Sequence, residues 1–251
     1  MPTSTVTVST RAQWQQSRQP VLASRALPSG AAFLSVGQRE VEQGFASVAA
    51  RYGFAPGWEL NARLSHRLTR WSTPGGLGDQ AEGFGTDIGL SWLARPESGA
   101  PALLLDVRAD LFSRPAVPDA DPKWLDGMEC GVTAYRSLDP VVLSLSTRYR
   151  WQPDRSDTSA GSFPTHSVLL APQVNFAVNA QVTLVAGLSL QYRDAPADVG
   201  SDSRSRVATA LRLGLGYAAS RRSTLFVNAN IATSGAGRGA GLDLEWLYRF
   251  Q

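Results

Sequence analysis

The sequence predicts an all-β protein, a transmembrane antiparallel up-and-down β-barrel of about 12 strands. Three features of the 251 residues support this prediction. Apolar and polar side chains alternate with a period of two along most of the chain. The alternating segments are about 10 residues or longer, whereas strands of soluble proteins average about 5–6. Short and long polar connections between the segments follow one another in turn.

Residues 181–192 show the alternation well. Every second side chain is apolar and the others are polar or small, a pattern that no helical period explains. The apolar set is Val182, Leu184, Ala186, Leu188, Leu190 and Tyr192, and the opposing set is Gln181, Thr183, Gly187, Ser189 and Gln191. Residues 58–69, 141–151 and 242–250 repeat the pattern with charged side chains in the polar set. Each segment therefore predicts a strand with one apolar and one polar face.

The lengths of the segments favour a sheet that crosses a membrane. A tilted membrane strand needs about 9–11 residues, which most of the segments supply. No stretch approaches the ~20 consecutive apolar residues of a membrane helix. In a membrane barrel, lipid-facing and lumen-facing residues alternate, so such a stretch is not expected.

About 12 segments form the predicted wall, an even number that returns both termini to the periplasmic side. They are residues 31–37, 44–52, 58–71, 84–94, 102–112, 124–135, 141–151, 166–178, 181–192, 206–217, 224–232 and 241–250. Residues 5–14 also alternate, weakly. If they form a strand, the barrel has 14 strands or one of the short segments is wrong. The predicted domains are residues 1–29, an N-terminal lead-in left open as a plug or an extra strand, and residues 30–251, the outer-membrane β-barrel.

The connections support the same topology, because outer-membrane barrels have short periplasmic turns and longer outer loops. Short turns fall at residues 54–57, 95–101, 137–140, 179–180 and 218–223, and longer loops at residues 72–83, 114–123, 152–165 and 193–203. Aromatic residues gather near both ends of the segments, as the two membrane interfaces favour. Phe250, after Trp246 and Tyr248, is similar to the C-terminal signature recognised by the barrel-assembly machinery, although Gln251 follows it.

Two motifs resemble a known family. Residues 51–60 (Arg-Tyr-Gly-Phe-Ala-Pro-Gly-Trp-Glu-Leu) are similar to the "YG-turn-LEL" hairpin of an outer-membrane channel family, the meta-pathway phenol-degradation proteins. Residues 85–90 (Gly-Thr-Asp-Ile-Gly-Leu) resemble the G-D-x-G-L strand that follows in the family. The likeness covers residues 28–251. The secretion channel of the Fap functional-amyloid system is related to this group, so the resemblance implies a barrel of about 12 strands with an N-terminal plug. The chain lacks the long N-terminal coiled-coil region of that exporter.

Strand parity turns many charged side chains toward the lumen. The predicted pore-lining residues are Arg63, Arg67, Asp106, Arg108, Asp110, Glu129, Arg148, Arg150, Arg212, Asp243, Glu245 and Arg249. Parity also turns Arg51, Glu59 and Asp87 inward. Because unpaired buried charges are costly, these groups must pair or face water. Two interpretations stay open, a mixed network that stiffens the wall and a permeation path whose field the charges set. Arg63, Arg67, Arg148 and Arg150 are the candidates for an anion-attracting ladder.

Composition excludes several other classes of function. There are 24 Lys and Arg against 21 Asp and Glu, and the basic residues are spread out, so no nucleic-acid partner is expected. Cys130 is the single cysteine, and His66 and His166 are the two histidines. Neither histidine lies in a recognisable catalytic motif. The chain is therefore not predicted to be an enzyme, and no cofactor or metal site is expected.

The sequence suggests a bacterial outer-membrane location, with the signal peptide removed. No signal peptide is visible after Met1. If the barrel prediction is right, we expect that Met1 is an expression start on a mature sequence and that the native precursor carries a Sec signal.

The leading functional hypothesis is an outer-membrane channel that gives passage to small hydrophilic solutes or to an unfolded secreted polypeptide. The first alternative is an integral outer-membrane enzyme, or a structural or adhesive barrel with a sealed lumen. A soluble β-sandwich or lipocalin-like binder is the third. The expected partners are outer-membrane lipid and the barrel-assembly machinery, with either secretion-system components or further copies of the chain. The transported substrate stays open.

Overall fold

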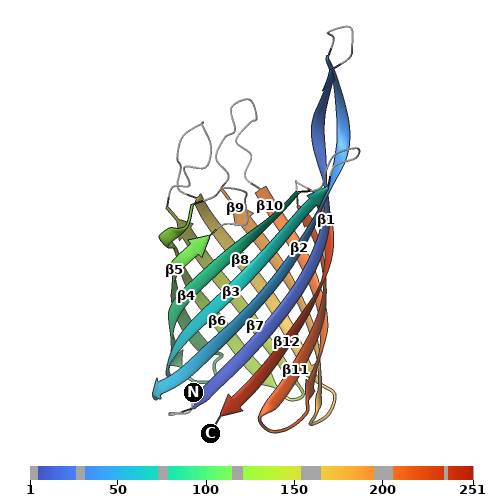
Figure 1. Cartoon of the computed structure of the whole chain (residues 1–251). Helices are drawn as coiled ribbons and strands as arrows, with labels where there is room; N and C mark the ends of the chain where they lie inside the picture. The colour runs from blue at the N-terminus through green and yellow to red at the C-terminus, as the bar shows by residue number, and fades with distance from the viewer. Residues whose placement is uncertain are drawn as a thin grey trace.

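The chain forms a closed antiparallel β-barrel in which each strand pairs with its neighbours in sequence (Figure 1). The computed structural model describes residues 5–26, 32–72, 79–114, 121–153, 165–194, 206–234 and 237–250. Its strands are β1 (Val6–Ala26), β2 (Ala32–Ala55), β3 (Trp58–Ser72), β4 (Asp79–Arg95), β5 (Ala102–Arg114), β6 (Lys123–Leu138), β7 (Val141–Gln152), β8 (Thr165–Ala177), β9 (Val182–Arg193), β10 (Arg206–Ala218), β11 (Ser223–Ser234) and β12 (Gly237–Phe250). In the part of the chain that is described, no helix is long and apolar enough to cross a membrane.

The barrel closes where the first strand meets the last. β1 pairs antiparallel with β12, from Val6 opposite Phe250 to Arg18 opposite Arg238. The two termini lie at the same end of the barrel, and the strand ends that the longer connections join, such as those of β7 and β8, lie at the opposite end (Figure 1). We call these the terminal end and the loop end. Counted between the strand ends, the predicted alternation of short turns and longer connections holds from β4 to β10, whereas the connections β3–β4 and β4–β5 are equally long, at 6 residues each.

The N-terminal segment contributes a strand of the wall. Residues 6–26, for which the sequence left a lead-in, a plug and an extra strand open, form β1. The barrel nevertheless has 12 strands rather than 14, because the separate strands predicted at residues 31–37 and 44–52 are one strand, β2. The polar run between them, residues 38–43, does not form a loop. It lies where β2 crosses the rim of the barrel, with Glu40 opposite both Arg18 and Ser72.

Beyond this rim, β1 and β2 continue as a two-stranded ribbon. Residues 19–26 of β1 pair with residues 32–39 of β2, whereas the pairing of β1 with β12 ends at Arg18 and that of β2 with β3 ends at Glu40. The ribbon extends from the loop end of the barrel (Figure 1). Arg18 and Glu40 form an exposed ion pair, with Nε and Oε1 3.0 Å apart, at the point where the ribbon leaves the wall.

The apolar side chains of the barrel point outward. Along β10, Leu211, Leu213, Leu215 and Tyr217 are all exposed by more than 40%, and the residues between them face the interior. Among the described residues, the buried apolar side chains are few, namely Val41, Ala81, Ala102 and Val185. A soluble barrel that binds a ligand would have the opposite arrangement, with its apolar residues inside. Lipid replaces the hydrophobic core, and the prediction of a transmembrane barrel is confirmed.

Aromatic residues pack against one another on the outer surface near both ends of the barrel. At the terminal end, Trp58 and Trp92 stack with ring centroids 5.4 Å apart. At the loop end, Phe112 and Trp124 meet edge to face at 5.1 Å. Such belts lie where a membrane meets water, since the rings have both apolar and polar parts.

The wall is irregular where β5 meets β4 and β6. Leu111 has no partner in either register, since Asp110 pairs with Asp87 and Gly127, and Phe112 pairs with Thr86 and Trp124. On β6 the extra residues are Leu125, at a φ of 53°, and Asp126. A bulge of this kind re-aims side chains. It leaves Leu125 on the outer surface and buries Asp126.

A charge on the outward face tests this orientation. We expect Leu213→Arg to lower the free energy of unfolding by about 2–4 kcal/mol, because Leu213 lies near the middle of β10 and arginine there meets hydrocarbon. The measurement is guanidinium unfolding in lipid vesicles, followed by tryptophan fluorescence. Ala210→Arg, whose side chain faces the interior of the same strand, is the control and should cost less. Equal losses would contradict the assignment of the two faces.

Candidate functional site in the barrel lumen

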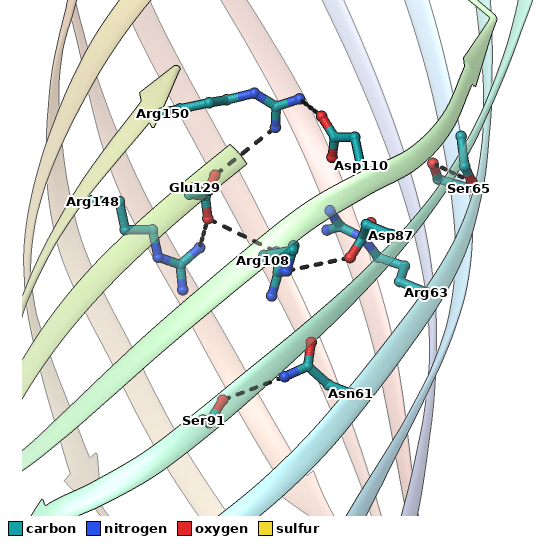
Figure 2. A network of polar contacts seen from close by, with 11 residues as sticks. Asn61, Arg63, Ser65, Asp87, Ser91, Arg108, Asp110, Glu129, Arg148 and Arg150 are labelled. Carbon is teal, nitrogen blue, oxygen red and sulfur yellow. Dashed lines mark hydrogen bonds and ion pairs between the residues drawn. The ribbon is translucent and has the colours of Figure 1, made fainter. Parts of the chain in front are cut away.

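The inward faces of β3 to β7 hold a cluster of charged side chains that we call the lumenal ion-pair network (Figure 2). Its members come from five neighbouring strands and are Arg63, Asp87, Arg108, Asp110, Glu129, Arg148 and Arg150. Each side chain lies on the face opposite the exposed apolar residues of its strand. The period-two alternation of the sequence therefore brings these charges together.

Two of the three acidic members, Asp87 and Glu129, each contact more than one arginine. Asp87 accepts from Arg63, with Nε and Oδ2 2.7 Å apart, and lies 3.2 Å from the Nε of Arg108. A carboxylate oxygen of Glu129 lies 3.6 Å from Nη1 of Arg148. The distances from the Glu129 carboxylate to Nη1 of Arg108 and to Nη1 of Arg150 are both 3.9 Å. Arg150 also donates to Asp110. The pairs form one continuous chain of charge from β3 to β7 (Figure 2).

The carboxylates lie deeper in the wall than the guanidinium groups. The side chain of Asp87 is 5% exposed and that of Glu129 15%, whereas Arg148 is 38% exposed. Aspartate is short, so its carboxylate lies against the backbone, and the longer arginine projects further into the lumen. The network holds four arginines and three carboxylates. A solute inside the barrel therefore meets a surface with more positive than negative charge.

The pairs follow a diagonal across the strands. Arg148 is in register with Gly131 but reaches Glu129, and Arg150 is in register with Glu129 but reaches Asp110. β6 runs from the loop end to the terminal end, and β5 and β7 run the other way. Each of these two arginines of β7 therefore contacts a carboxylate that lies one inward position nearer the loop end than the arginine's own row of register partners.

A second, smaller group lies on the inward faces of β1, β11 and β12. Asp243 is almost fully buried, accepts from Arg11, and lies 3.3 Å from the donating Nδ2 of Asn228. On β10, Arg212 donates through Nε to Asn230 at 3.1 Å. This group holds the guanidinium groups of Arg11 and Arg212, the carboxylate of Asp243 and two uncharged amides.

The strands between the two groups have uncharged inward faces. The inward residues of β8 and β9 are Ser167, Leu169, Ala171, Gln173, Asn175, Thr183, Val185, Gly187, Ser189 and Gln191. β8 and β9 therefore form an uncharged stripe of the lumen wall between the two groups of charged side chains. Extensive contacts join only strands that are neighbours in the barrel, so no described segment crosses the interior.

The predicted pore-lining residues divide between these surroundings. Six belong to the lumenal ion-pair network, namely Arg63, Arg108, Asp110, Glu129, Arg148 and Arg150. Arg212 and Asp243 belong to the second group. Arg67 lies on the inward parity of β3 nearer the loop end, Asp106 on that of β5, and Glu245 and Arg249 on that of β12. Their part in permeation stays a prediction.

Sequence analysis missed Arg11 and Asn228. Arg11 lies in the weakly alternating run, residues 5–14, which was not assigned to the wall. The available signal was the alternation itself, because Arg11 shares a face with Ser9 and Gln13, whereas Ala12 and Trp14 lie on the other face. Asn228 carries no charge and so was not selected. Its role depends on the register of β11 and β12, which places Asn228 opposite Asp243.

The described residues contain no group of three or more His, Cys, Asp or Glu side chains arranged to hold a metal ion. The two histidines have partners on the outward face. His66 lies 3.7 Å from Glu82, and Tyr149 and His166 share a hydrogen bond of 2.6 Å between Oη and Nδ1. The chemistry available in the lumen is therefore electrostatic, from guanidinium and carboxylate groups.

Removing Asp87 should destabilise the barrel, because it leaves Arg63 and Arg108 without their common partner. We expect Asp87→Asn to lower the free energy of unfolding by about 1–3 kcal/mol. The control, Glu82→Gln, removes an exposed pair on the outside and should change it by less than about 1 kcal/mol. Unfolding in guanidinium measures both. A loss for Asp87→Asn no larger than that of the control would show that the network does not stabilise the wall.

The fold is similar to that of several solved outer-membrane proteins. No protein-family model and no curated protein matches the sequence. The structure is similar to the COG4313 outer membrane channel from Pseudomonas putida F1, with a TM-score of 0.72 at 14% identity over 100% of this chain and 97% of that one. The translocator domain of the autotransporter NalP from Neisseria meningitidis gives 0.61 at 12% identity over 100% and 90%. The NanC porin gives 0.56 at 9% identity over 93% and 98%.

These three proteins are a channel, an autotransporter domain and a porin, and all are barrels of the bacterial outer membrane. At 9–14% identity the likeness extends to the fold and not to particular side chains. The chain therefore has the fold of the outer-membrane channel barrels.

Proposed function

We propose that the protein is a passive channel of the bacterial outer membrane that admits small hydrophilic solutes and prefers anions. The observation that supports this most directly is the contrast between the two faces of the wall. Apolar side chains cover the outside, while the lumen carries paired charges and neutral polar groups. A wall of this kind can shield a polar solute from hydrocarbon along its whole path.

The preference for anions follows from the depth of the charges. The carboxylates of the lumenal ion-pair network are held against the wall, and the guanidinium groups of Arg148 and Arg150 project into the lumen. A passing ion interacts most strongly with the charges nearest to it. The arginines therefore determine the field along the permeation path, even though the acidic groups are almost as numerous.

The alternatives receive less support from the structure. In an outer-membrane hydrolase a histidine would have to face a nucleophile, whereas His66 and His166 interact with Glu82 and Tyr149 on the outer surface. A sealed structural barrel would need side chains or a segment to fill the lumen, and no described segment crosses it. Passage of an unfolded polypeptide, and membership of the meta-pathway phenol-degradation channel family, stay predictions.

Planar-bilayer recordings test the proposal. The purified protein should give discrete conductance steps in potassium chloride, and the reversal potential in a salt gradient should show a preference for chloride. A barrel that inserts without conductance steps would favour the sealed alternative. Release of products from a lipid or peptide substrate would favour the enzyme.

Neutralising the exposed arginines should reduce the preference for anions. A unit charge about 10 Å from an ion in water contributes about 0.4 kcal/mol, favourable for chloride and unfavourable for potassium. Each arginine therefore changes the permeability ratio of chloride to potassium about fourfold, and Arg148→Gln with Arg150→Gln should lower it about 16-fold. Glu129→Gln should change the ratio in the opposite direction. Arg221→Gln, in the exposed turn between β10 and β11, is the control and should leave the reversal potential unchanged. Unchanged reversal potentials in the double variant would rule out a role of this network in selectivity.

A further inference from the structure

Asp106 lies on the inward face of β5, next to the lumenal ion-pair network but outside it. In register it stands between Ser91 of β4 and Gly131 of β6, and Arg148 of β7 is the next residue in the same row. A Cβ at Gly131 would lie 2.6 Å from Oδ1 and 2.8 Å from Oδ2 of Asp106. The carboxylate therefore lies over the backbone of Gly131 and depends on the absence of a side chain there.

This carboxylate has no cationic partner. Its Oδ2 is buried and forms no hydrogen bond, and no ion pair joins Asp106 to any described residue. By contrast, Asp87, Asp110, Glu129 and Asp243 each hold at least one arginine. Asp106 is thus the lumenal aspartate whose charge the wall leaves unbalanced.

The diagonal order of the ion pairs explains why no arginine pairs with Asp106. Arg150 reaches toward the loop end to Asp110, and Arg148 reaches in the same direction to Glu129. On the same diagonal, a cation for Asp106 would come from one inward position further toward the terminal end of β7. That position holds Ser146, whose hydroxyl is hydrogen-bonded to Thr133 at 2.9 Å. β7 therefore has no arginine at the position from which this diagonal would lead to Asp106.

The other neighbours of Asp106 offer oxygen atoms. Asn61 donates through Nδ2 to the hydroxyl of Ser91 at 3.3 Å, which leaves the carbonyl Oδ1 of this amide as an acceptor (Figure 2). That Oδ1 lies over Gly89, where a Cβ would come within 2.5 Å of it. Two glycines therefore make room at this level of the lumen, where Asn61 Oδ1 adds an acceptor next to the row of Ser91 and Asp106.

We propose that Asp106 binds the primary ammonium group of a permeating solute. This proposal rests on the proposed channel function and names a class of solute for it. A primary ammonium is a compact cation with three N–H donors, which matches an unbalanced carboxylate among hydroxyl and amide oxygens. Arg148 lies two strands away in the same row, about 10 Å across the sheet, so the same solute can present a carboxylate to the arginines.

Single-channel recordings with two small cations test this proposal. At constant ionic strength, ethylammonium chloride should reduce the potassium chloride current of the wild-type channel in a saturable way. Tetramethylammonium chloride, which has the same charge but no N–H donor, should not. In Asp106→Asn the ethylammonium concentration for half reduction should rise at least about tenfold, because a charge-assisted hydrogen bond is lost. Gly131→Ala, which displaces the carboxylate, should have the same effect.

The controls separate this proposal from the stability of the barrel and from the channel function itself. Asp106→Asn removes an unbalanced charge, so its free energy of unfolding should stay the same or increase. Asp110→Asn removes a carboxylate that holds Arg150 and should keep the response to ethylammonium.

Three outcomes would overturn the proposal while leaving the channel function in place. The first is an equal response of the wild type to both cations, and the second is an unchanged response in Asp106→Asn. The third is a changed potassium chloride current in Asp106→Asn without any dependence on ethylammonium, which would show that Asp106 acts by pairing with Arg148 and not by binding the solute. A wild-type protein without conductance would contradict the proposed function as well.

Discussion

Closure of the backbone hydrogen-bond ladder between β1 and β12 is the constraint on which the rest of the structure depends. In hydrocarbon, each unpaired N–H or C=O group costs several kcal/mol, so a membrane sheet cannot keep an open edge. The pairing of Val6–Arg18 with residues 238–250 removes that edge. Beyond Arg18, β1 pairs only with β2, and the outer edges of this ribbon need water. The end of the β1–β12 ladder therefore marks the place where the chain leaves the membrane.

Closure also decides where charges can lie. Once lipid covers the outside, every charged side chain in the wall has to face the lumen or extend to an interface. Side-chain length then separates the charges by depth. The carboxylate of Asp87 lies against the strands, and the guanidinium of Arg148 reaches toward the centre. A wall with almost equal numbers of acidic and basic groups thus presents a positive surface to the lumen.

The sequence predicts the faces of the strands well, because a period of two is a local property of the chain. It therefore placed Arg63, Arg148 and Glu129 inward. It could not predict their partners, because these depend on the register between strands: Arg148 is in register with Gly131 but reaches Glu129. The polar run in β2, residues 38–43, resembles a break between two strands, because a strand that has left the hydrocarbon no longer needs apolar residues. β1 was weak as a signal because Thr7, Ser9 and Thr10 are polar on both faces.

The bulge at β5 and β6 shows that the wall gives up regular pairing to hold acidic groups inside. Gly127 faces inward beside Asp110, so regular alternation would turn Asp126 toward lipid. Instead, the extra residues let Asp126 lie 2% exposed within the wall, and Leu125 takes a φ of 53° on the outer surface. A left-handed conformation at a leucine costs on the order of 1–3 kcal/mol and persists only where its surroundings require it. The turn at Leu125 thus keeps the carboxylate of Asp126 within the wall, where it adds negative charge beside the network of arginines.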